Sequence, residues 1–317
     1  MVCAHLIRMV KVMARVLIAD PVAESAQKRL EKAGLTVVIR KPETDGPLEK
    51  QIKGFECIVV RSATKVTKEV IAASDKLKLI VRAGVGLDNV DAEAAKAKGI
   101  KVLNTPEGPS VSVAELVFGL MLSLIRFLPL ADRTMKEEKW EKKKLEGTEL
   151  YKKTLGIVGL GRIGAEVAKR AKSFDMDVLA YDVIDISKTC KDLGIKRAEL
   201  KDIIEKSDFV TVHVPLVPQT RGMIGEKELA RMKKTAYVIN TSRGGIVDET
   251  ALLKALDAGT IAGAGLDVYM DEPPKDWKLV KHPKVVATPH IASSTLEAQS
   301  RIGELTVDKV IAEFAKK

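Results

Sequence analysis

One stretch of the sequence constrains the fold more than any other, because it sets three glycines in a fixed pattern between a strand and a helix. The stretch begins at Thr154 and reads TLGIVGLGRIGAEVAKRAKSFDMDVLAYD. An apolar run leads into the pattern G-x-G-x-x-G, an amphipathic run follows it, and a second apolar run ends at Asp182. This order of elements predicts a βαβ unit of the dinucleotide-binding type.

The residues of this unit favour NAD as the cofactor. Gly159, Gly161 and Gly164 permit a tight turn and let a pyrophosphate approach the helix N-terminus, where the N–H groups of Arg162 and Ile163 point. Asp182 lies where an acceptor for the adenosine ribose hydroxyls is expected, and its charge repels a 2′-phosphate. No arginine follows Asp182, so NAD is favoured over NADP. A glycine-rich turn of purely structural use is the alternative.

Short apolar runs alternate with helical patterns along the whole chain, which is typical of parallel sheets covered by helices. We therefore expect an α/β protein with two doubly wound parallel-sheet domains. The first series of predicted strands covers residues 15–19, 36–39, 57–60, 79–81 and 101–103. The second series covers residues 154–159, 177–181, 209–214, 236–240, 263–267 and 285–288.

Two predicted helices do not fit a simple strand–helix alternation. The segment SVSVAELVFGLMLSLIRFLPL, which begins at Ser110, is too apolar for a surface helix, so we expect it to pack between domains or subunits. The final helix, over residues 293–315, is followed by no strand. It either caps the second domain or returns to the first.

Composition argues against several classes of partner. The formal net charge is +10, but the basic residues are spread over the chain and aromatic residues make up only 4%. We therefore expect a solvated charged surface that attracts small anions, and no nucleic acid as a partner. No apolar run has the length of a membrane span, and the first twenty residues do not resemble a signal peptide, so no membrane association is expected.

Cysteine usage points to a reducing compartment. Cys3, Cys57 and Cys190 show no metal-like spacing, so we expect incidental thiols, no metal site and a cytoplasmic location. Met9 and Met13 are plausible alternative starts of the chain.

Three polar residues follow predicted strands at the carboxyl edge of the second sheet, where such sheets bind ligands. They are Arg243, Glu272 and His290. An imidazole can exchange the proton of a substrate hydroxyl near neutral pH, and a glutamate can hold its other ring nitrogen and favour the protonated ring. A guanidinium can bind a substrate carboxylate through two hydrogen bonds. Together with the NAD site, this set predicts hydride transfer on a carboxylate-bearing alcohol.

The chain resembles the D-isomer-specific 2-hydroxyacid dehydrogenases over nearly its whole length beyond Ala14. The motifs that carry this resemblance include VRSATKVT from Val60, VRAGVGLDNVD from Val81, NTPEGPSVSVAEL from Asn104 and KWEKKKLEGTEL from Lys139. The second half adds TVHVPLVPQTRGMIG, INTSRGGIVDE, AGAGLDVYMDEPP and TPHIASSTLEAQ.

The resemblance implies roles for particular residues. It assigns catalysis to Arg243, Glu272 and His290. Besides the residues of the glycine loop and Asp182, it implies cofactor contacts at Val85, Val214, Pro215, Thr241, Ser242, Asp267, His290 and Ala292. It implies substrate contacts at Arg61, Ser62, Gly84, Gly86, Arg243 and His290.

The resemblance also implies an organisation and a reaction. Residues 1–104 with 292–317 would form a flavodoxin-like substrate-binding domain, and residues 105–291 an inserted Rossmann NAD-binding domain. We expect one domain to swing on the other, and a homodimer formed through the NAD-binding domain. The expected reaction is NAD-dependent oxidation of a small anionic 2-hydroxy acid to the 2-keto acid. Arg61 and the lysines at 142–144 suit a phosphorylated substrate, D-3-phosphoglycerate.

The sequence departs from the family pattern in two respects. It stops at Lys317, so we expect no C-terminal regulatory domain of the kind found in longer members and no serine feedback through one. Positions 85 and 214 are valines, where threonine can occur in the family, so only backbone contacts are expected there.

Two other functions stay open. A glyoxylate or hydroxypyruvate reductase of the same family would act on unphosphorylated acids. A non-enzymatic, NAD-sensing binding protein could keep this fold, but the complete arginine, glutamate and histidine set argues against it.

Overall fold

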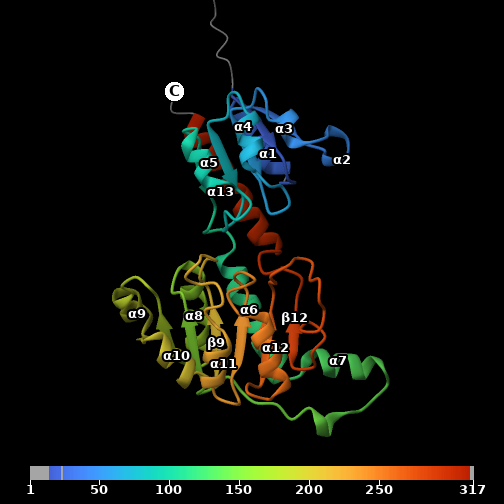
Figure 1. Cartoon of the computed structure of the whole chain (residues 1–317), viewed down its shortest axis with the longest axis vertical. Coiled ribbons are helices and arrows are strands. Elements are labelled where there is room, and N and C mark those ends of the chain that lie inside the picture. Colours follow the sequence, from blue (N-terminus) through green and yellow to red (C-terminus); the bar gives the residue numbers. More distant parts are fainter. Residues whose placement is uncertain (1–13, 23, 315–317) are drawn as a thin grey trace, which may run out of the picture. The chain divides into compact units, whose positions relative to one another are not determined.

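The computed structural model describes residues 14–22 and 24–314, which fold into two compact α/β units (Figure 1). Unit 1 comprises residues 1–109 and 296–317, and unit 2 comprises residues 110–295. The sequence had suggested boundaries at 104/105 and 291/292. Cys3, His5, Met9 and Met13 lie outside the described residues.

Unit 1 contains a sheet of five parallel strands in the order β2-β1-β3-β4-β5. This is the flavodoxin-like order, and it confirms the predicted fold class. All five strands lie within a residue of their predicted positions: β1 (Arg15–Ile18), β2 (Thr36–Ile39), β3 (Cys57–Val60), β4 (Leu79–Arg82) and β5 (Lys101–Asn104).

Helices cover both faces of this sheet. On one face α1 (Glu24–Lys32) packs against the final helix, α13 (Leu296–Phe314), and both contribute to a core with Val16, Val59 and Val81. The other face is covered by α3 (Leu48–Gln51), α4 (Lys68–Ala73) and α5 (Ala92–Ala97), while α2 (Pro42–Asp45) follows β2. The final helix therefore returns to the first unit, which settles the alternative left open by the sequence.

Unit 2 contains a sheet of seven parallel strands in the order β12-β11-β10-β9-β6-β7-β8. The chain starts at β6, winds out through β7 and β8, and returns to the other side of β6 at β9, as in a Rossmann fold. The strands are β6 (Thr154–Val158), β7 (Asp177–Tyr181), β8 (Lys196–Arg197), β9 (Phe209–Val212), β10 (Tyr237–Asn240), β11 (Gly263–Leu266) and β12 (Val285–Ala287). The sequence missed β8, because its two residues are charged and exposed.

The helices of unit 2 form two layers. The core on one face includes side chains of α6 (Ser110–Ile125), α8 (Arg162–Ser173) and α9 (Ser187–Leu193). The core on the other face includes side chains of α10 (Leu200–Lys206), α11 (Glu226–Arg231) and α12 (Glu249–Asp257). After α6, the chain forms α7 (Leu128–Lys136) and a short 3-10 turn at Lys142–Lys144 before it enters the sheet.

Helix α6 is buried in the core of unit 2. Its side chains pack against α8 and the strands β10, β11 and β12. On β11, a Cβ added to Gly265 would lie 3.0 Å from Leu120 Cβ, so the glycine permits close packing of helix on sheet. Burial within unit 2 accounts for the apolar character of this helix, and its expected packing between domains or subunits stays a prediction.

In the described part of the chain, no single helix is long and apolar enough to cross a membrane. Only α6 and α7 taken together, with a bend of 63° between them, reach that length and composition.

The packing of α6 predicts opposite effects for two neighbouring substitutions. Leu120 is 1% exposed, so Leu120→Ala should leave a cavity and lower the free energy of unfolding by about 2–5 kcal/mol. A Cβ at Gly119 would meet no atom within 4 Å, so Gly119→Ala should raise that free energy by about 0.5–1 kcal/mol through helix propensity. Guanidinium unfolding followed by circular dichroism measures both. Equal effects at the two positions would contradict this placement of the helix.

Candidate functional site

The residues that directly follow the strands of unit 2 share one edge of its sheet. They are Gly159, Asp182, His213, Thr241 and Asp267, after β6, β7, β9, β10 and β11 respectively. Because all these strands are parallel, their carboxyl ends meet at this edge, and the order of the chain reverses between β6 and β9. Ligands of doubly wound sheets bind at such a reversal.

The glycine loop after β6 fits a bound pyrophosphate. Gly159 has φ +95°, and a Cβ there would lie 2.7 Å from the carbonyl oxygen of His213, so the loop passes directly over β9. A Cβ at Gly164 would lie 2.2 Å from the carbonyl oxygen of Gly159, which keeps α8 close to the strand. A Cβ at Gly161 would meet no atom within 4 Å. The loop is thus tight where it packs and open at the N-terminus of α8, as an anion site requires.

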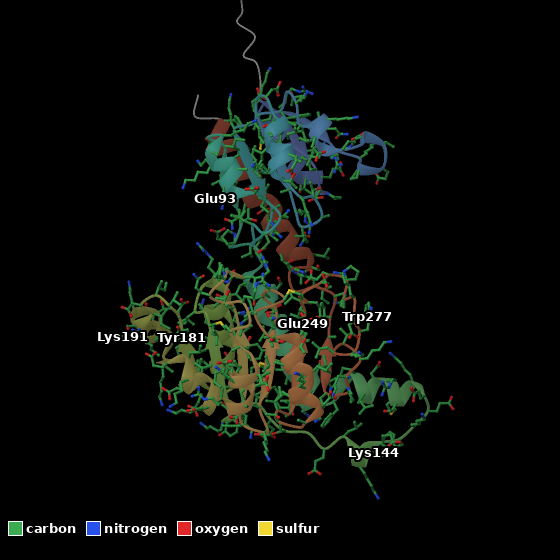
Figure 2. All side chains as sticks on the ribbon, viewed as in Figure 1. Glu93, Lys144, Tyr181, Lys191, Glu249 and Trp277 are labelled. Atoms are coloured by element: carbon green, nitrogen blue, oxygen red, sulfur yellow. The ribbon has the colours of Figure 1, made fainter. Side chains whose placement is uncertain are left out.

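Asp182 follows Tyr181, which Figure 2 labels at the end of β7. Its Oδ2 accepts a hydrogen bond from the Leu160 N–H at 2.8 Å, and its Oδ1 a longer one from the Ile184 N–H at 3.4 Å. The carboxylate therefore braces the glycine loop as well as standing where a ribose acceptor is expected. The sequence did not predict this bracing.

Thr241 and His213 carry buried polar atoms that lack a hydrogen-bond partner within the described residues. These atoms are Thr241 Oγ1 and His213 Nδ1. The other ring nitrogen of His213 bonds Thr211 Oγ1 at 3.0 Å. Since buried polar groups in proteins are normally paired, the Thr241 hydroxyl is suited to a ligand at this edge. Burial lowers the pKa of His213 to about 3, so its ring stays neutral and cannot act as an acid near neutral pH.

His290 and Glu272 form a close pair. His290 Nδ1 lies 2.7 Å from Glu272 Oε2, and Glu272 Oε1 accepts a hydrogen bond from the Tyr269 N–H at 3.1 Å. The two side chains are 41% and 39% exposed, so solvent can reach them. Partial burial raises the pKa of Glu272, but hydrogen bonding to His290, the charge of His290, the Tyr269 N–H and the charge of Arg243 outweigh it and lower that pKa overall.

Arg243 lies on a turn shaped by Asn240, the last residue of β10. Asn240 Nδ2 donates to the carbonyl of Arg243 at 2.9 Å, and Asn240 Oδ1 accepts from the N–H and hydroxyl of Ser242 at 3.0 and 2.9 Å. The guanidinium donates to the Ser242 carbonyl at 2.6 Å. Its charge acts on Glu272, so the structure brings Arg243, Glu272 and His290 together on one unit.

Asp267 holds the loop that carries His290. Its carboxylate is fully buried and accepts hydrogen bonds from Thr288 Oγ1 at 2.6 Å, the Ile291 N–H at 2.8 Å and the Ala292 N–H at 2.9 Å. His290 lies between these donors with φ +54°, a backbone conformation that needs such support. The family resemblance implied only a cofactor contact for Asp267, and this positioning role was not predicted.

In unit 1, Arg61 and Ser62 follow β3 on a loop held from two sides. The buried Asp20 accepts from the N–H groups of Arg61 and Thr64, at 2.5 and 3.2 Å, and from Thr64 Oγ1 at 2.7 Å. Asn89 Nδ2 donates to the carbonyls of Arg61 and Thr64, at 2.5 and 2.6 Å. The backbone is fixed by these groups, while the Ser62 side chain is exposed and that of Arg61 half-buried.

The loop with Gly84, Val85 and Gly86 follows β4 at the same edge of the first sheet. Gly84 has φ +145°, a backbone conformation that favours glycine, and a Cβ there would lie 1.5 Å from the Arg82 guanidinium, which packs against the turn. Asn104 Nδ2 donates to the carbonyl of Val85 at 2.5 Å. The Arg82 guanidinium lies beside the same turn and donates to the Ala83 carbonyl at 3.5 Å.

The remaining titratable candidates fall outside these clusters. Cys57 and Cys190 are buried, and burial raises the pKa of both thiols. The side chain of His282 is only 11% exposed, and its Nδ1 accepts from the Lys284 N–H at 3.1 Å. Lys144 pairs with Glu141 at 2.7 Å on a segment that runs away from the sheet of unit 2 (Figure 2). Among the described residues no cluster of His, Cys, Asp and Glu could hold a metal ion.

Known proteins resemble this chain over most of its length. It is 49% identical over 290 residues to D-3-phosphoglycerate dehydrogenase of Homo sapiens, covering 92% of this chain and 54% of that protein. It is 46% identical over 299 residues to D-3-phosphoglycerate dehydrogenase of Methanocaldococcus jannaschii, covering 94% of this chain and 57% of that protein. The chain thus spans about half the length of these relatives.

Among solved structures, a glyoxylate reductase from Paecilomyes thermophila superposes with a TM-score of 0.87 at 30% identity, covering 96% of both chains. Residues 118–292, more than half of the chain, match the family described as D-isomer specific 2-hydroxyacid dehydrogenase, NAD binding domain. This match lies within unit 2 and contains the glycine loop and the whole Arg243, Glu272 and His290 cluster. The chain belongs to the D-isomer specific 2-hydroxyacid dehydrogenases, and its second unit carries their NAD-binding domain.

Proposed function

We propose that the chain is an enzyme that oxidises the C2 hydroxyl of D-3-phosphoglycerate with NAD, giving 3-phosphohydroxypyruvate, the first step of serine biosynthesis. The observation that carries the proposal is the 2.7 Å pair of His290 and Glu272 beside Arg243, at the ligand-binding edge of an NAD-type sheet. The identity to D-3-phosphoglycerate dehydrogenases over 92–94% of this chain supports the choice of substrate.

The geometry gives each catalytic residue a separate task. Because His290 Nδ1 is held by Glu272, the other ring nitrogen, Nε2, is left to take the proton from the substrate hydroxyl. Glu272 stabilises the imidazolium that forms. Arg243 binds the substrate carboxylate through two hydrogen bonds and orients C2. The glycine loop and Asp182 would hold NAD, which would supply the acceptor for the hydride of C2, while His290 takes the hydroxyl proton.

The cofactor-binding set is proposed from the edge of the second sheet and from the family pattern. The pyrophosphate would lie at the glycine loop and the ribose hydroxyls at Asp182. Thr241 would offer its buried hydroxyl to the cofactor. The full set is Val85, Gly159, Gly161, Arg162, Ile163, Gly164, Asp182, Val214, Pro215, Thr241, Ser242, Asp267, His290 and Ala292.

The substrate-binding set adds residues of unit 1. Arg61 and Ser62 would bind the substrate phosphate, and the backbone of Gly84 and Gly86 the carboxylate end. In this assignment residues 1–104 with 292–317 form the substrate-binding domain, and residues 105–291 the NAD-binding domain.

We further propose a homodimer formed through the NAD-binding domain and a cytoplasmic location. Large apolar side chains are exposed along α7 and the segment after it: Leu128 is 51%, Met135 56%, Trp140 79% and Tyr151 54% exposed. Exposed apolar side chains along this part of the chain suit burial against a second copy. The buried free thiols of Cys57 and Cys190 suit a reducing compartment.

A reductase acting on unphosphorylated keto acids is the second candidate. The fit to a glyoxylate reductase, with a TM-score of 0.87, favours it. NADH absorbance decides between the two. The proposal expects reduction of NAD with 3-phosphoglycerate at a kcat/KM at least tenfold above that for glycerate. Faster turnover of glyoxylate or hydroxypyruvate than of 3-phosphohydroxypyruvate would favour the reductase. Absence of turnover with all of these substrates would favour a binding protein.

Asp182 should control the choice of cofactor. Asp182→Asn keeps an acceptor for the Leu160 N–H but removes the charge that repels a 2′-phosphate. The ratio of kcat/KM for NAD to that for NADP should therefore fall, while thermal stability is retained. Asp182→Ala also removes the loop brace and should weaken both cofactors further. If the unaltered protein already prefers NADP, the assignment of this strand end is wrong.

Arg61 should determine selectivity for the phosphate. A charge-assisted phosphate contact contributes about 1.5–3 kcal/mol, so Arg61→Ala should lower the preference for 3-phosphoglycerate over glycerate by about tenfold or more. Lys65→Ala is the matched control, because it removes an equal charge from an exposed position on the same loop. Equal losses on the two substrates, measured as kcat/KM, would assign Arg61 a structural role.

The charge of Glu272 should set the pH dependence of both directions. Oxidation requires the neutral ring of His290, so its kcat/KM rises with pH, whereas reduction requires the imidazolium and falls with pH. Glu272→Gln keeps the shape of the side chain but removes the carboxylate charge that pairs with the imidazolium at 2.7 Å. The pH midpoints of kcat/KM for oxidation and for reduction should therefore both move to lower pH, and the maximal rate should fall.

Asp271→Asn provides the control for this pH profile. Asp271 carries the same charge one residue away but pairs with Lys275 at 2.9 Å, so its replacement should leave both midpoints in place. If both pH midpoints stay in place in the Glu272→Gln protein, Glu272 does not act on the proton exchange of His290.

A further inference from the structure

Glu249 joins helix α12 to the turn that carries Glu272. It is the first residue of α12 and is labelled in Figure 2. Its Oε1 accepts a hydrogen bond from the Met270 N–H at 2.5 Å. Met270 lies in the four-residue turn after β11 that ends at Glu272, so the carboxylate of Glu249 fixes the backbone of that turn from outside the catalytic cluster.

Two successive backbone N–H groups of this turn donate to two different glutamates. The Tyr269 N–H donates to Glu272 Oε1 at 3.1 Å, and the Met270 N–H donates to Glu249. The two peptide planes are linked through one Cα, so a rotation that breaks the second hydrogen bond also disturbs the first. The orientation of Glu272, and with it the contact to His290 at 2.7 Å, depends on both.

The turn is also packed against the loop that carries Arg243. A Cβ added to Gly244 would lie 1.9 Å from the carbonyl oxygen of Tyr269 and 2.5 Å from the Met270 nitrogen. Arg221 NH1 lies 3.7 Å from Met270 Sδ on the same turn. The peptide between Tyr269 and Met270 is thus in contact with the Arg243 loop and anchored by Glu249.

The surroundings of Glu249 do not favour its charge. Burial raises its pKa, the Met270 N–H opposes that shift, and the nearby carboxylates of Asp271, Asp248 and Glu272 raise the pKa further. Asp248 is itself engaged in capping α12, since it accepts from the Ala251 N–H. A glutamate kept half-buried among three other carboxylates is explained if its acceptor oxygen, and not its charge, is what the turn requires.

We propose that Glu249 is a positioning residue for the His290–Glu272 pair, acting through its hydrogen bond with the Met270 amide. The inference rests on the proposed function for the roles of His290 and Glu272, and it adds a residue outside the catalytic and cofactor-binding sets assigned above. It requires an acceptor at position 249. Gln can supply that acceptor and Ala cannot.

The test compares three variants of the full chain. Glu249→Ala removes the acceptor, Glu249→Gln keeps it without the charge, and Glu226→Ala removes an exposed glutamate from the same first position of the neighbouring helix α11. Losing the hydrogen bond to a partly buried amide should lower kcat about tenfold in Glu249→Ala. The pH midpoint of oxidation should shift downward, as for Glu272→Gln, and KM for NAD should change less than about twofold. Glu249→Gln should restore the midpoint and most of kcat, and Glu226→Ala should match the unaltered protein.

Two results would overturn the proposal. One is a Glu249→Ala protein with the kcat and midpoint of the Glu226→Ala control. The other is a Glu249→Gln protein that loses as much as Glu249→Ala, which would mean that charge and not the acceptor is required.

A readout without turnover separates this proposal from the proposed function. The chain has four histidines, so the ring-proton signal of His290 can be assigned by its loss in His290→Gln and then titrated by NMR. Its midpoint should fall in Glu249→Ala and recover in Glu249→Gln, whichever substrate the enzyme uses. A shifted midpoint without activity on 3-phosphoglycerate would reject the proposed substrate and keep the role of Glu249. An unshifted midpoint in a protein that does oxidise 3-phosphoglycerate would keep the proposed substrate and reject the role of Glu249.

Discussion

The buried carboxylate of Asp267 is the interaction on which the candidate site depends. Burying a charge is costly unless hydrogen bonds replace its water, and here Thr288, Ile291 and Ala292 supply three donors. All three donors belong to the loop around His290. The hydrogen bonds that stabilise the buried charge therefore also fix the conformation of this loop. The Asp267 N–H in turn donates to the carbonyl of Asn240 at 2.9 Å, which ties the loop to the sheet. The position of His290 is therefore set by Asp267, the residue that directly follows β11.

A carboxylate that accepts hydrogen bonds from the backbone of a neighbouring loop also occurs at other strand ends. In each case the loop carries candidate functional residues and lies beyond the edge of a parallel sheet. In unit 1, Asp20 lies beyond β1 and accepts from the backbone of the Arg61 loop, although the two are far apart in the chain. After β7, Asp182 accepts from the glycine loop that follows β6. Each carboxylate is held by N–H groups from the loop of a neighbouring strand. A loop fixed in this way leaves its own side chains, such as Arg61, available for a ligand.

Much of the fold could be predicted from local patterns, and the reasons for the failures are physical. Apolar runs located the larger strands, because a strand buried on both faces is apolar along its length. That rule cannot detect β8, whose two residues are charged and exposed. Apolarity alone also could not tell whether the helix from Ser110 is buried in a core or at an interface. The glycine loop and the three catalytic candidates follow strand ends, a property of the sequence. The bond from Met270 to Glu249 joins residues 21 apart and follows no local pattern.

Two histidines near one sheet edge show how environment decides which of them can exchange protons. His213 directly follows β9, with Nε2 bonded to Thr211 and Nδ1 buried, and burial lowers its pKa to about 3. Its ring is therefore neutral near neutral pH. His290 lies three residues beyond β12, where its side chain is 41% exposed and has a carboxylate partner at 2.7 Å. That partner compensates the charge of the protonated ring, and solvent access lets the proton leave. The position of His290 beyond the strand end, with solvent access and a carboxylate partner, is therefore what suits its ring to the proton exchange proposed for it, whereas the ring of His213 stays neutral near neutral pH.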